Sequence, residues 1–218
     1  MSYNIAIDGP AGAGKSTIAK RLAKELNFIY VDTGAMYRGI ALYMIRKGID
    51  PRDEAAVSAA VPEAKVTIKY EDGVQKIILN GEDVSGLIRT EDVSFAASTT
   101  SAFKAVRAKL LDLQRDLARE NDVIMDGRDI GTTILPNADV KVYLTASVET
   151  RAKRRYDELI EKGESHDLKK IEEDIRLRDE QDMTREISPL KKAEDAIEVD
   201  SSNMTIDEVV ETIKSLVK

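Results

Sequence analysis

A glycine-rich segment near the start of the chain combines the residue types that hold a nucleoside triphosphate. Residues 9–16, Gly-Pro-Ala-Gly-Ala-Gly-Lys-Ser, match the pattern G-x-x-x-x-G-K-[S/T]. The glycines let backbone N–H groups turn toward phosphate oxygens, and the lysine can reach the β- and γ-phosphates. We therefore predict that Lys15 binds phosphate and that Ser16 binds Mg²⁺. The predicted triphosphate site comprises Gly9, Pro10, Ala11, Gly12, Ala13, Gly14, Lys15, Ser16 and Thr17.

Two further segments place arginines and carboxylates where strands are expected to end. Residues 32–38 (DTGAMYR) and 126–131 (DGRDIG) each follow an apolar run. Parallel strands end at one edge of a sheet, so Arg38 and Arg128 are predicted to lie near the triphosphate loop and to bind a second phosphate. Asp126 offers a carboxylate for Mg²⁺, through a bound water. The alternative is that both arginines are surface charges and that the strand-end aspartates cap helices.

A third group of arginines lies in two charged segments further along the chain. Glu and Asp are interleaved with them, so a solvated helix surface held by ion pairs is an equally good interpretation. Phosphoryl transfer nevertheless relies on cations around the γ-phosphoryl group, and arginines on a mobile lid would also exclude water. The arginines concerned are Arg151, Arg154, Arg155, Arg176, Arg178 and Arg185.

The elements that must position these residues alternate between strand and helix patterns, which predicts a three-layer α/β/α domain. Five runs, expected to be parallel strands, lie at 3–8, 28–32, 123–126, 140–144 and 196–200. Amphipathic spacing predicts helices at 15–26, 33–47, 91–101, 104–120, 148–162, 168–182 and 206–217. Two short runs joined through Asp-Gly predict an inserted antiparallel hairpin at 66–70 and 76–80.

Composition narrows the chemistry further. The chain has 218 residues, no cysteine, one histidine and a net charge of −7. These values exclude disulfides, thiolate metal sites and a cysteine nucleophile, and they argue against a nucleic-acid-binding protein. His166 lies in a polar stretch and is expected to be an exposed loop residue without a catalytic role. No secretion leader or membrane span is evident, so the expected location is the cytoplasm.

The triphosphate loop alone does not distinguish a GTPase, an ATPase motor and a small-molecule kinase. A guanine-specific GTPase is expected to carry Asn-Lys-x-Asp, which is absent, and a motor usually needs a longer chain. Both alternatives are therefore weakened, and a small-molecule kinase is favoured.

Several motifs in one order resemble the bacterial cytidylate kinases: IAIDGPAGAGKST, VDTGAMYR, GEDVSGLIRTEDV, AAS, VR, DGRDIGT and RDEQDMTREISPL. The resemblance spans nearly the whole chain. It implies Mg²⁺- and ATP-dependent phosphorylation of CMP and dCMP in pyrimidine metabolism, by a single domain related to adenylate kinase. The implied parts are a core (1–60, 100–147 and 186–218), an NMP-binding insertion (about 61–99) and a helical lid (about 148–185).

The resemblance also implies roles for individual residues. Lys15, Arg128, Arg178 and Arg185 would act in catalysis, and Arg151, Arg154 and Arg155 would join the ATP site from the lid. CMP would be bound by Thr33, Arg38, Ser98, Arg107, Arg128, Asp129, Arg178, Asp182 and Arg185. Thr33 stands where the family often has serine, and it keeps the hydroxyl.

Three of these residues are expected to face cytosine: Ser98, Arg107 and Asp129. Cytosine presents an amino donor beside two acceptors, whereas uracil reverses that pattern at positions 3 and 4.

Three alternatives stay open at this point. The first is a kinase for another nucleoside monophosphate such as UMP or AMP, and the second is a nucleotide sensor without catalytic activity. The third is a nucleic-acid-binding protein that uses its arginine clusters. A monomer is expected.

Overall fold

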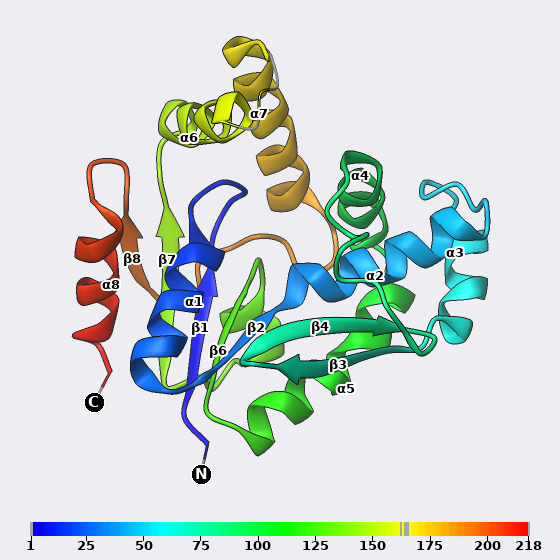
Figure 1. Cartoon of the computed structure of the whole chain (residues 1–218), viewed down its shortest axis with the longest axis horizontal. Helices are drawn as coiled ribbons and strands as arrows, with labels where there is room; N and C mark the ends of the chain where they lie inside the picture. Colours follow the sequence, from blue (N-terminus) through cyan, green and yellow to red (C-terminus); the bar gives the residue numbers. More distant parts are fainter. Residues whose placement is uncertain (1, 162, 164–165, 218) are drawn as a thin grey trace. The chain divides into compact units, whose positions relative to one another are not determined.

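The computed structural model describes residues 2–161, 163 and 166–217 (Figure 1). Its larger sheet has the strand order β2-β6-β1-β7-β8, and its smaller sheet has the order β3-β4-β5. The larger sheet contains β1 (Asn4–Asp8), β2 (Ile29–Asp32), β6 (Val123–Gly127), β7 (Val140–Thr145) and β8 (Ile197–Asp200). The smaller sheet contains β3 (Val66–Glu71), β4 (Val74–Leu79) and β5 (Glu82–Asp83). The predicted fold class, a five-stranded sheet with helices and an antiparallel hairpin, is confirmed.

Apart from α3, which was not predicted, the helices agree with the predicted ranges to within a few residues. They are α1 (Lys15–Leu26), α2 (Thr33–Arg46), α3 (Glu54–Ala60), α4 (Glu91–Thr100), α5 (Lys104–Glu120), α6 (Val148–Glu161), α7 (Leu168–Thr184) and α8 (Ile206–Lys214). Lys162, the predicted last residue of one helix, lies outside the described residues. None of the helices in the described ranges has both the length and the apolar run needed to cross a bilayer.

Four short elements were not predicted: α3, the 3₁₀ turn η1 (Val61–Glu63), the strand β5 and the π-helical turn η2 (Ile130–Ile134). Each has seven residues or fewer, so none provides enough positions for a helical or alternating apolar pattern to be recognised.

Contacts between residues divide the chain into two compact units. The first contains residues 2 and 29–123. Its central element is α2, which packs against α4 and the β3–β4 hairpin. Gly39 allows this close approach, because a Cβ atom there would lie only 3.1 Å from Cγ2 of Ile77. Gln75 of β4 fastens the hairpin to the end of β2, since its side chain accepts from Asp32 N (2.8 Å) and donates to Asp32 O (3.1 Å).

The second unit contains residues 3–28 and 124–217. Within it, β1 and β7 pair in parallel from Ile5 to Asp8, and α1 lies beside α8. The helices α6 and α7 pack on each other around a small apolar cluster of Ala152, Leu159, Ile171 and Ile175. This unit carries the glycine-rich loop and both charged helices that follow β7.

Candidate active site

The glycine-rich loop runs from the end of β1 to the start of α1 with three glycines at positive φ. Gly9 has φ 150°, and a Cβ atom there would lie 1.9 Å from the carbonyl oxygen of Leu144. Gly12 and Gly14 have φ 75° and 86°, a region that side chains disfavour. Gly14 directly precedes the first residue of α1. The loop conformation therefore depends on glycine, and it ends at a helix N-terminus, where anions bind favourably.

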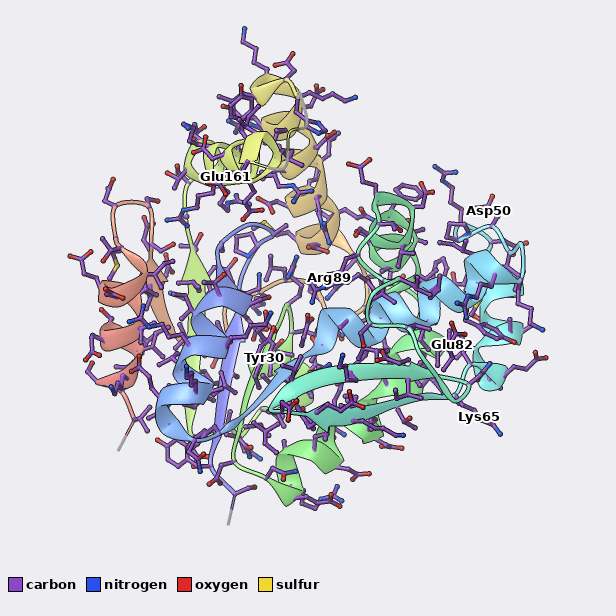
Figure 2. The ribbon with its side chains drawn as sticks, viewed as in Figure 1. Tyr30, Asp50, Lys65, Glu82, Arg89 and Glu161 are labelled. Carbon is purple, nitrogen blue, oxygen red and sulfur yellow. The ribbon has the colours of Figure 1, made fainter. Side chains whose placement is uncertain are left out.

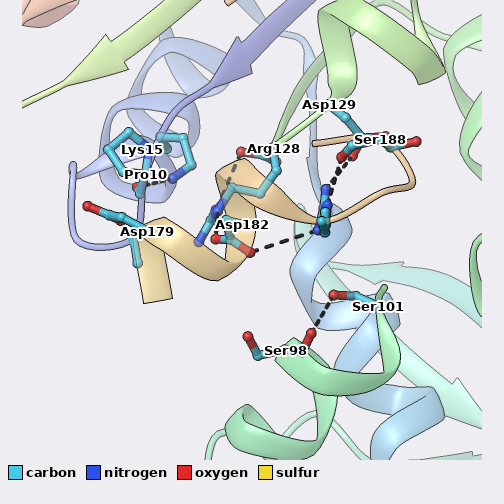
Figure 3. Close-up of polar contacts among 12 residues, drawn as sticks. Pro10, Lys15, Ser98, Ser101, Arg128, Asp129, Asp179, Asp182 and Ser188 are labelled. Atoms are coloured by element: carbon cyan, nitrogen blue, oxygen red, sulfur yellow. Dashed lines mark hydrogen bonds and ion pairs between the residues drawn. The ribbon is translucent and has the colours of Figure 1, made fainter. Parts of the chain in front are cut away.

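Lys15 is buried at the base of this loop. Its Nζ donates to the carbonyl oxygen of Pro10 at 2.7 Å (Figure 3), and the residue is only 6% exposed. Burial lowers the pKa of Lys15 well below its usual range, and the charge of Arg128 lowers it further, against the opposing effect of three nearby carboxylates. A phosphate bound in the loop would provide the counter-charge that this ammonium group needs.

Ser16 and Asp126 form an oxygen pair beside Lys15. The hydroxyl of Ser16 donates to Oδ2 of Asp126 at 2.8 Å, which joins the start of α1 to β6. Within the described residues, no group of three or more His, Cys, Asp or Glu side chains is arranged to hold a metal. Mg²⁺ is usually held by one or two protein oxygens together with phosphates and water, so these two residues fit an ion that arrives with a nucleotide.

Asp8, the last residue of β1, organises the segment that follows β6. Its two carboxylate oxygens accept from the backbone N–H groups of Ile130 and Gly131, each at 2.7 Å. Burial raises the pKa of Asp8 to about 6, although the two backbone hydrogen bonds act in the opposite direction. The carboxylate thus holds the first turn of η2, immediately after Arg128 and Asp129.

Two predicted arginines form a network with two predicted aspartates in this unit. Nε of Arg128 donates to Asp182 at 2.8 Å, and both residues are labelled in Figure 3. Arg185 lies 3.7 Å from Asp129 and 3.8 Å from Asp182. Burial alone would raise the pKa of Asp182, but Arg128 and its neighbouring arginines hold it below the usual value. Arg178 is half-buried on α7, the helix that carries Asp182, and it also lowers the pKa of Asp182. The structure therefore brings these five predicted residues together.

The lid arginines go to different places. Arg151 is buried and donates to Ala11 of the loop at 2.9 Å. Arg154 donates to the carbonyl oxygen of Ser201 at 2.7 Å, and Arg155 is exposed and lies 3.5 Å from Glu158. Among the described residues, Arg151 is the one of these three arginines that contacts the loop.

Two further sequence expectations have definite outcomes. His166 lies in the loop before α7 as expected, but it is partly buried rather than exposed. Arg176 forms an ion pair with Glu149 at 2.8 Å on an exposed surface. This agrees with the interpretation of Arg176 as part of a solvated helix surface held by ion pairs.

In the first unit, basic side chains gather where β2 meets α2. Asp32 caps α2 by accepting from Ala35 N at 2.8 Å, and Thr33 is buried at the first helical position. The guanidinium of Arg38 lies 3.6 Å from Asp32, and that of Arg89, labelled in Figure 2, lies 3.3 Å from it. Two cations therefore face one carboxylate at a helix N-terminus, which leaves positive charge for an anion.

A second group in this unit holds Arg107 rigidly. Its guanidinium lies 5.6 Å from the ring centroid of Tyr37 and donates to the carbonyl oxygen of Ser101 at 3.2 Å. The hydroxyl of Ser101 in turn donates to the carbonyl oxygen of Ser98 (Figure 3). Arg107 and Ser98 are thus connected through Ser101, at the junction between α4 and α5.

Sequence reasoning assigned no role to Asp8, Arg89, Tyr37, Ser101 or Asp179. Asp8 and Tyr37 lie inside recognised motifs, so their place in the motif was the available signal. Arg89 and Asp179 also lie inside quoted motifs, but in charged stretches where nothing in the local pattern shows which partner a charge will meet.

A strand, a glycine loop with a buried lysine, and a helix whose first hydroxyl meets a strand-end carboxylate define a phosphate-loop nucleotide-binding protein. The family model described as cytidylate kinase matches residues 5–218. A cytidylate kinase from Lactobacillus gasseri is 54% identical over 98% of this chain and 93% of its own length. Another from Pediococcus pentosaceus is 50% identical over 99% and 96%. The chain belongs to the cytidylate kinase family and is therefore a nucleoside monophosphate kinase.

The fold recurs in a solved structure, that of an uncharacterized protein from Eubacterium ventriosum. It covers 99% of this chain and 98% of its own, with a TM-score of 0.52 and 12% identity. At that identity the match shows a shared fold alone.

Proposed function

We propose that this chain transfers the γ-phosphoryl group of ATP to the phosphate of CMP and dCMP, forming CDP and dCDP. One observation carries the proposal: in a chain of the cytidylate kinase family, the buried ammonium group of Lys15 lies at the base of a glycine loop that leads into a helix N-terminus. This arrangement suits the β- and γ-phosphates of ATP.

The reaction needs no covalent intermediate and no protein base. The attacking oxygen of CMP is already anionic, so the protein has to position it and to stabilise the charge on the transferring group. Lys15 would donate to phosphate oxygens, exchanging its bond to Pro10 for bonds to the substrate. The arginines proposed to act with it are Arg128, Arg178 and Arg185. All four side chains are cationic hydrogen-bond donors, so each would stabilise the negative charge on the oxygens of the transferring phosphoryl group.

The Ser16–Asp126 pair would hold Mg²⁺, through the Ser16 hydroxyl and through water on the Asp126 carboxylate. When bound with ATP, Mg²⁺ neutralises charge on the phosphate oxygens. The hydrogen bond between the two side chains holds the Ser16 hydroxyl beside the Asp126 carboxylate.

The residues proposed to bind the acceptor are those that the family motifs assign to CMP. Thr33 and Arg38, with Arg128, would bind the CMP phosphate, and Arg178, Asp182 and Arg185 would bind sugar and phosphate. Ser98, Arg107 and Asp129 would face cytosine. The stacking of Arg107 on Tyr37 supports this role, because it fixes the guanidinium as a directed donor for the O2 and N3 acceptors of cytosine. Uracil carries a donor at N3, so UMP would be a weaker acceptor.

Arg154 and Arg155 stay proposed ATP-site residues from the lid. We also propose that the chain works as a cytoplasmic monomer. We propose further that it does not bind nucleic acid, which the net charge of −7 supports.

An ADP-release assay with Mg·ATP and CMP, dCMP, UMP, AMP or GMP tests the proposal, with a sample lacking acceptor as the control for hydrolysis. We expect CMP and dCMP to exceed the other acceptors by at least about tenfold. Preference for another acceptor would refute the cytosine assignments but keep the triphosphate site. Tight nucleotide binding without any product would instead identify a sensor.

A further inference from the structure

Arg151 has an unusual environment for a lid residue. It is 4% exposed, and each of its three guanidinium nitrogens donates a hydrogen bond. Nε donates to Ala146 O (2.9 Å), Nη1 to Ala11 O (2.9 Å) and Nη2 to Oδ2 of Asp179 (2.6 Å). All of these residues belong to the second unit. One side chain therefore joins the end of β7, the phosphate loop and α7.

Asp179 completes this arrangement. Its side chain is 11% exposed, and its other oxygen, Oδ1, is buried without a hydrogen-bond partner among the described residues. The Asp179 carboxylate forms an ion pair with Arg151. A buried ion pair of this kind contributes little net stability, because both charges lose water, so its main effect is on where the two side chains lie.

The stem of Arg151 also lies against the loop. A Cβ atom on Gly12 would lie 3.4 Å from Cβ of Arg151, so the two backbones approach closely at this point. The bond to Ala11 O turns that carbonyl toward Arg151. The carbonyl oxygen of a phosphate loop must point away from the phosphates, because an inward carbonyl would repel them, whereas the N–H groups must point inward.

We propose that Arg151 and Asp179 are positioning residues that hold the phosphate loop in its ATP-binding conformation. Arg151 fixes the outward carbonyl of Ala11, and Asp179 fixes the guanidinium of Arg151. The inference rests on the proposed binding of ATP to the loop, but not on the identity of the acceptor. It differs from direct contact between Arg151 and ATP, and the two alternatives predict opposite effects for Asp179.

The test is the dissociation constant for a non-hydrolysable ATP analogue with Mg²⁺, measured by calorimetry without acceptor. Asp179→Asn removes the charge that holds Arg151. If the pair positions the loop, the population of the competent conformation falls, and we expect the dissociation constant to rise roughly tenfold. If Arg151 binds ATP directly, releasing it from Asp179 leaves the affinity unchanged or increases it, and that result would overturn the proposal.

Arg151→Lys is the second variant. It keeps a buried positive charge near Asp179 but cannot reach all three acceptors, so it guards against a folding defect in Asp179→Asn. We expect a similar rise in the dissociation constant. The double variant should be no weaker than the worse single variant, because both changes break one unit. Full additivity would overturn the proposal.

Arg176→Gln is the matched control. The Arg176–Glu149 ion pair joins the same two helices, α7 and α6, but both side chains are more than half exposed, and neither contacts the loop among the described residues. Its affinity should stay within about twofold of the unaltered chain. An equal loss in this control would mean that joining the helices, rather than holding the loop, explains the effect, and would overturn the proposal. If the unaltered chain bound the analogue but phosphorylated no acceptor, the proposed function alone would fail.

Discussion

Lys15, the proposed ligand of the ATP phosphates, is buried at a cost in stability. Its pKa is lowered, so the folded state disfavours the ammonium form that phosphate binding needs. In the proposed function, its position at the base of the loop would direct this charge toward the β- and γ-phosphates without a hydration shell to displace. Residues of this kind are expected to contribute to the rate far more than to folding.

We predict that Lys15→Met lowers turnover by about 10²- to 10³-fold, the usual loss for one preorganised charge. The melting temperature should stay the same or rise, because methionine removes a charge that burial disfavours. The assay is ADP release at saturating CMP, with thermal unfolding followed in parallel. Lys24→Met, which changes an exposed lysine on the same helix, is the control and should retain full activity. A folded, active Lys15→Met protein would contradict the assigned role.

At the scale of elements, the junction between β1 and α1 has the least freedom. Gly9 lies between β1 and the loop and has a φ of 150°. A Cβ atom added at Gly9 would lie 1.9 Å from a backbone carbonyl oxygen. That oxygen belongs to Leu144 in β7, the strand that pairs with β1, so neither partner can move without disturbing the sheet. The loop and the strand pair therefore depend on the same glycine.

We predict that Gly9→Ala destabilises the protein by about 3 kcal/mol or more, since a buried backbone atom cannot yield as a flexible side chain would. Urea unfolding followed by circular dichroism measures the change. Gly86→Ala is the control: its Cβ would meet no atom within 4 Å, and its φ is not positive. We expect that control to lie within about 0.5 kcal/mol of the unaltered chain. Equal stabilities for the two variants would show that the close approach in β7 is relieved.

At the scale of the whole molecule, 40 acidic residues against 33 basic ones set the response to pH. Carboxylates held in ion pairs, such as Asp182, have lowered pKa values and lose their stabilising effect as the pH falls. Asp8 acts in the opposite direction. Its pKa is raised from 3.8 to about 6, so the folded state binds this proton more tightly than the unfolded state does. Protonation of Asp8 therefore adds stability as the pH falls from about 6 toward 4.

We predict that the free energy of unfolding of the unaltered chain rises relative to Asp8→Asn as the pH is lowered from 7 to 4. The raised pKa corresponds to a relative gain of up to about 3 kcal/mol. Urea unfolding of both proteins at each pH gives the difference, and the many other carboxylates cancel because both proteins share them. A difference that stays constant with pH, or that falls, would show that Asp8 is not held in the way the structure describes.

The sequence by itself determined the parts of this protein whose causes are local. Fewer than thirty consecutive residues contain the glycine loop, the strand before it and the helix after it. The spacing of residue types in this segment predicts both its structure and its ligand. The Asp-Gly turn predicts the β3–β4 hairpin for the same reason. The motifs shared with cytidylate kinases extended this to the whole chain, and the family match bears that resemblance out.

Only the tertiary structure decided which charged side chains are buried and which groups they contact. Asp8 meets Ile130 and Gly131 more than 120 positions away, and Arg151 meets Ala11 140 positions away. Arg154 turns to Ser201, although it stands three residues from Arg151 in the same charged helix. A long flexible side chain has no preference for one acceptor until the fold places that acceptor within reach and removes the competing water. The sequence could therefore name the arginines, but only the folded arrangement of the second unit assigned their partners.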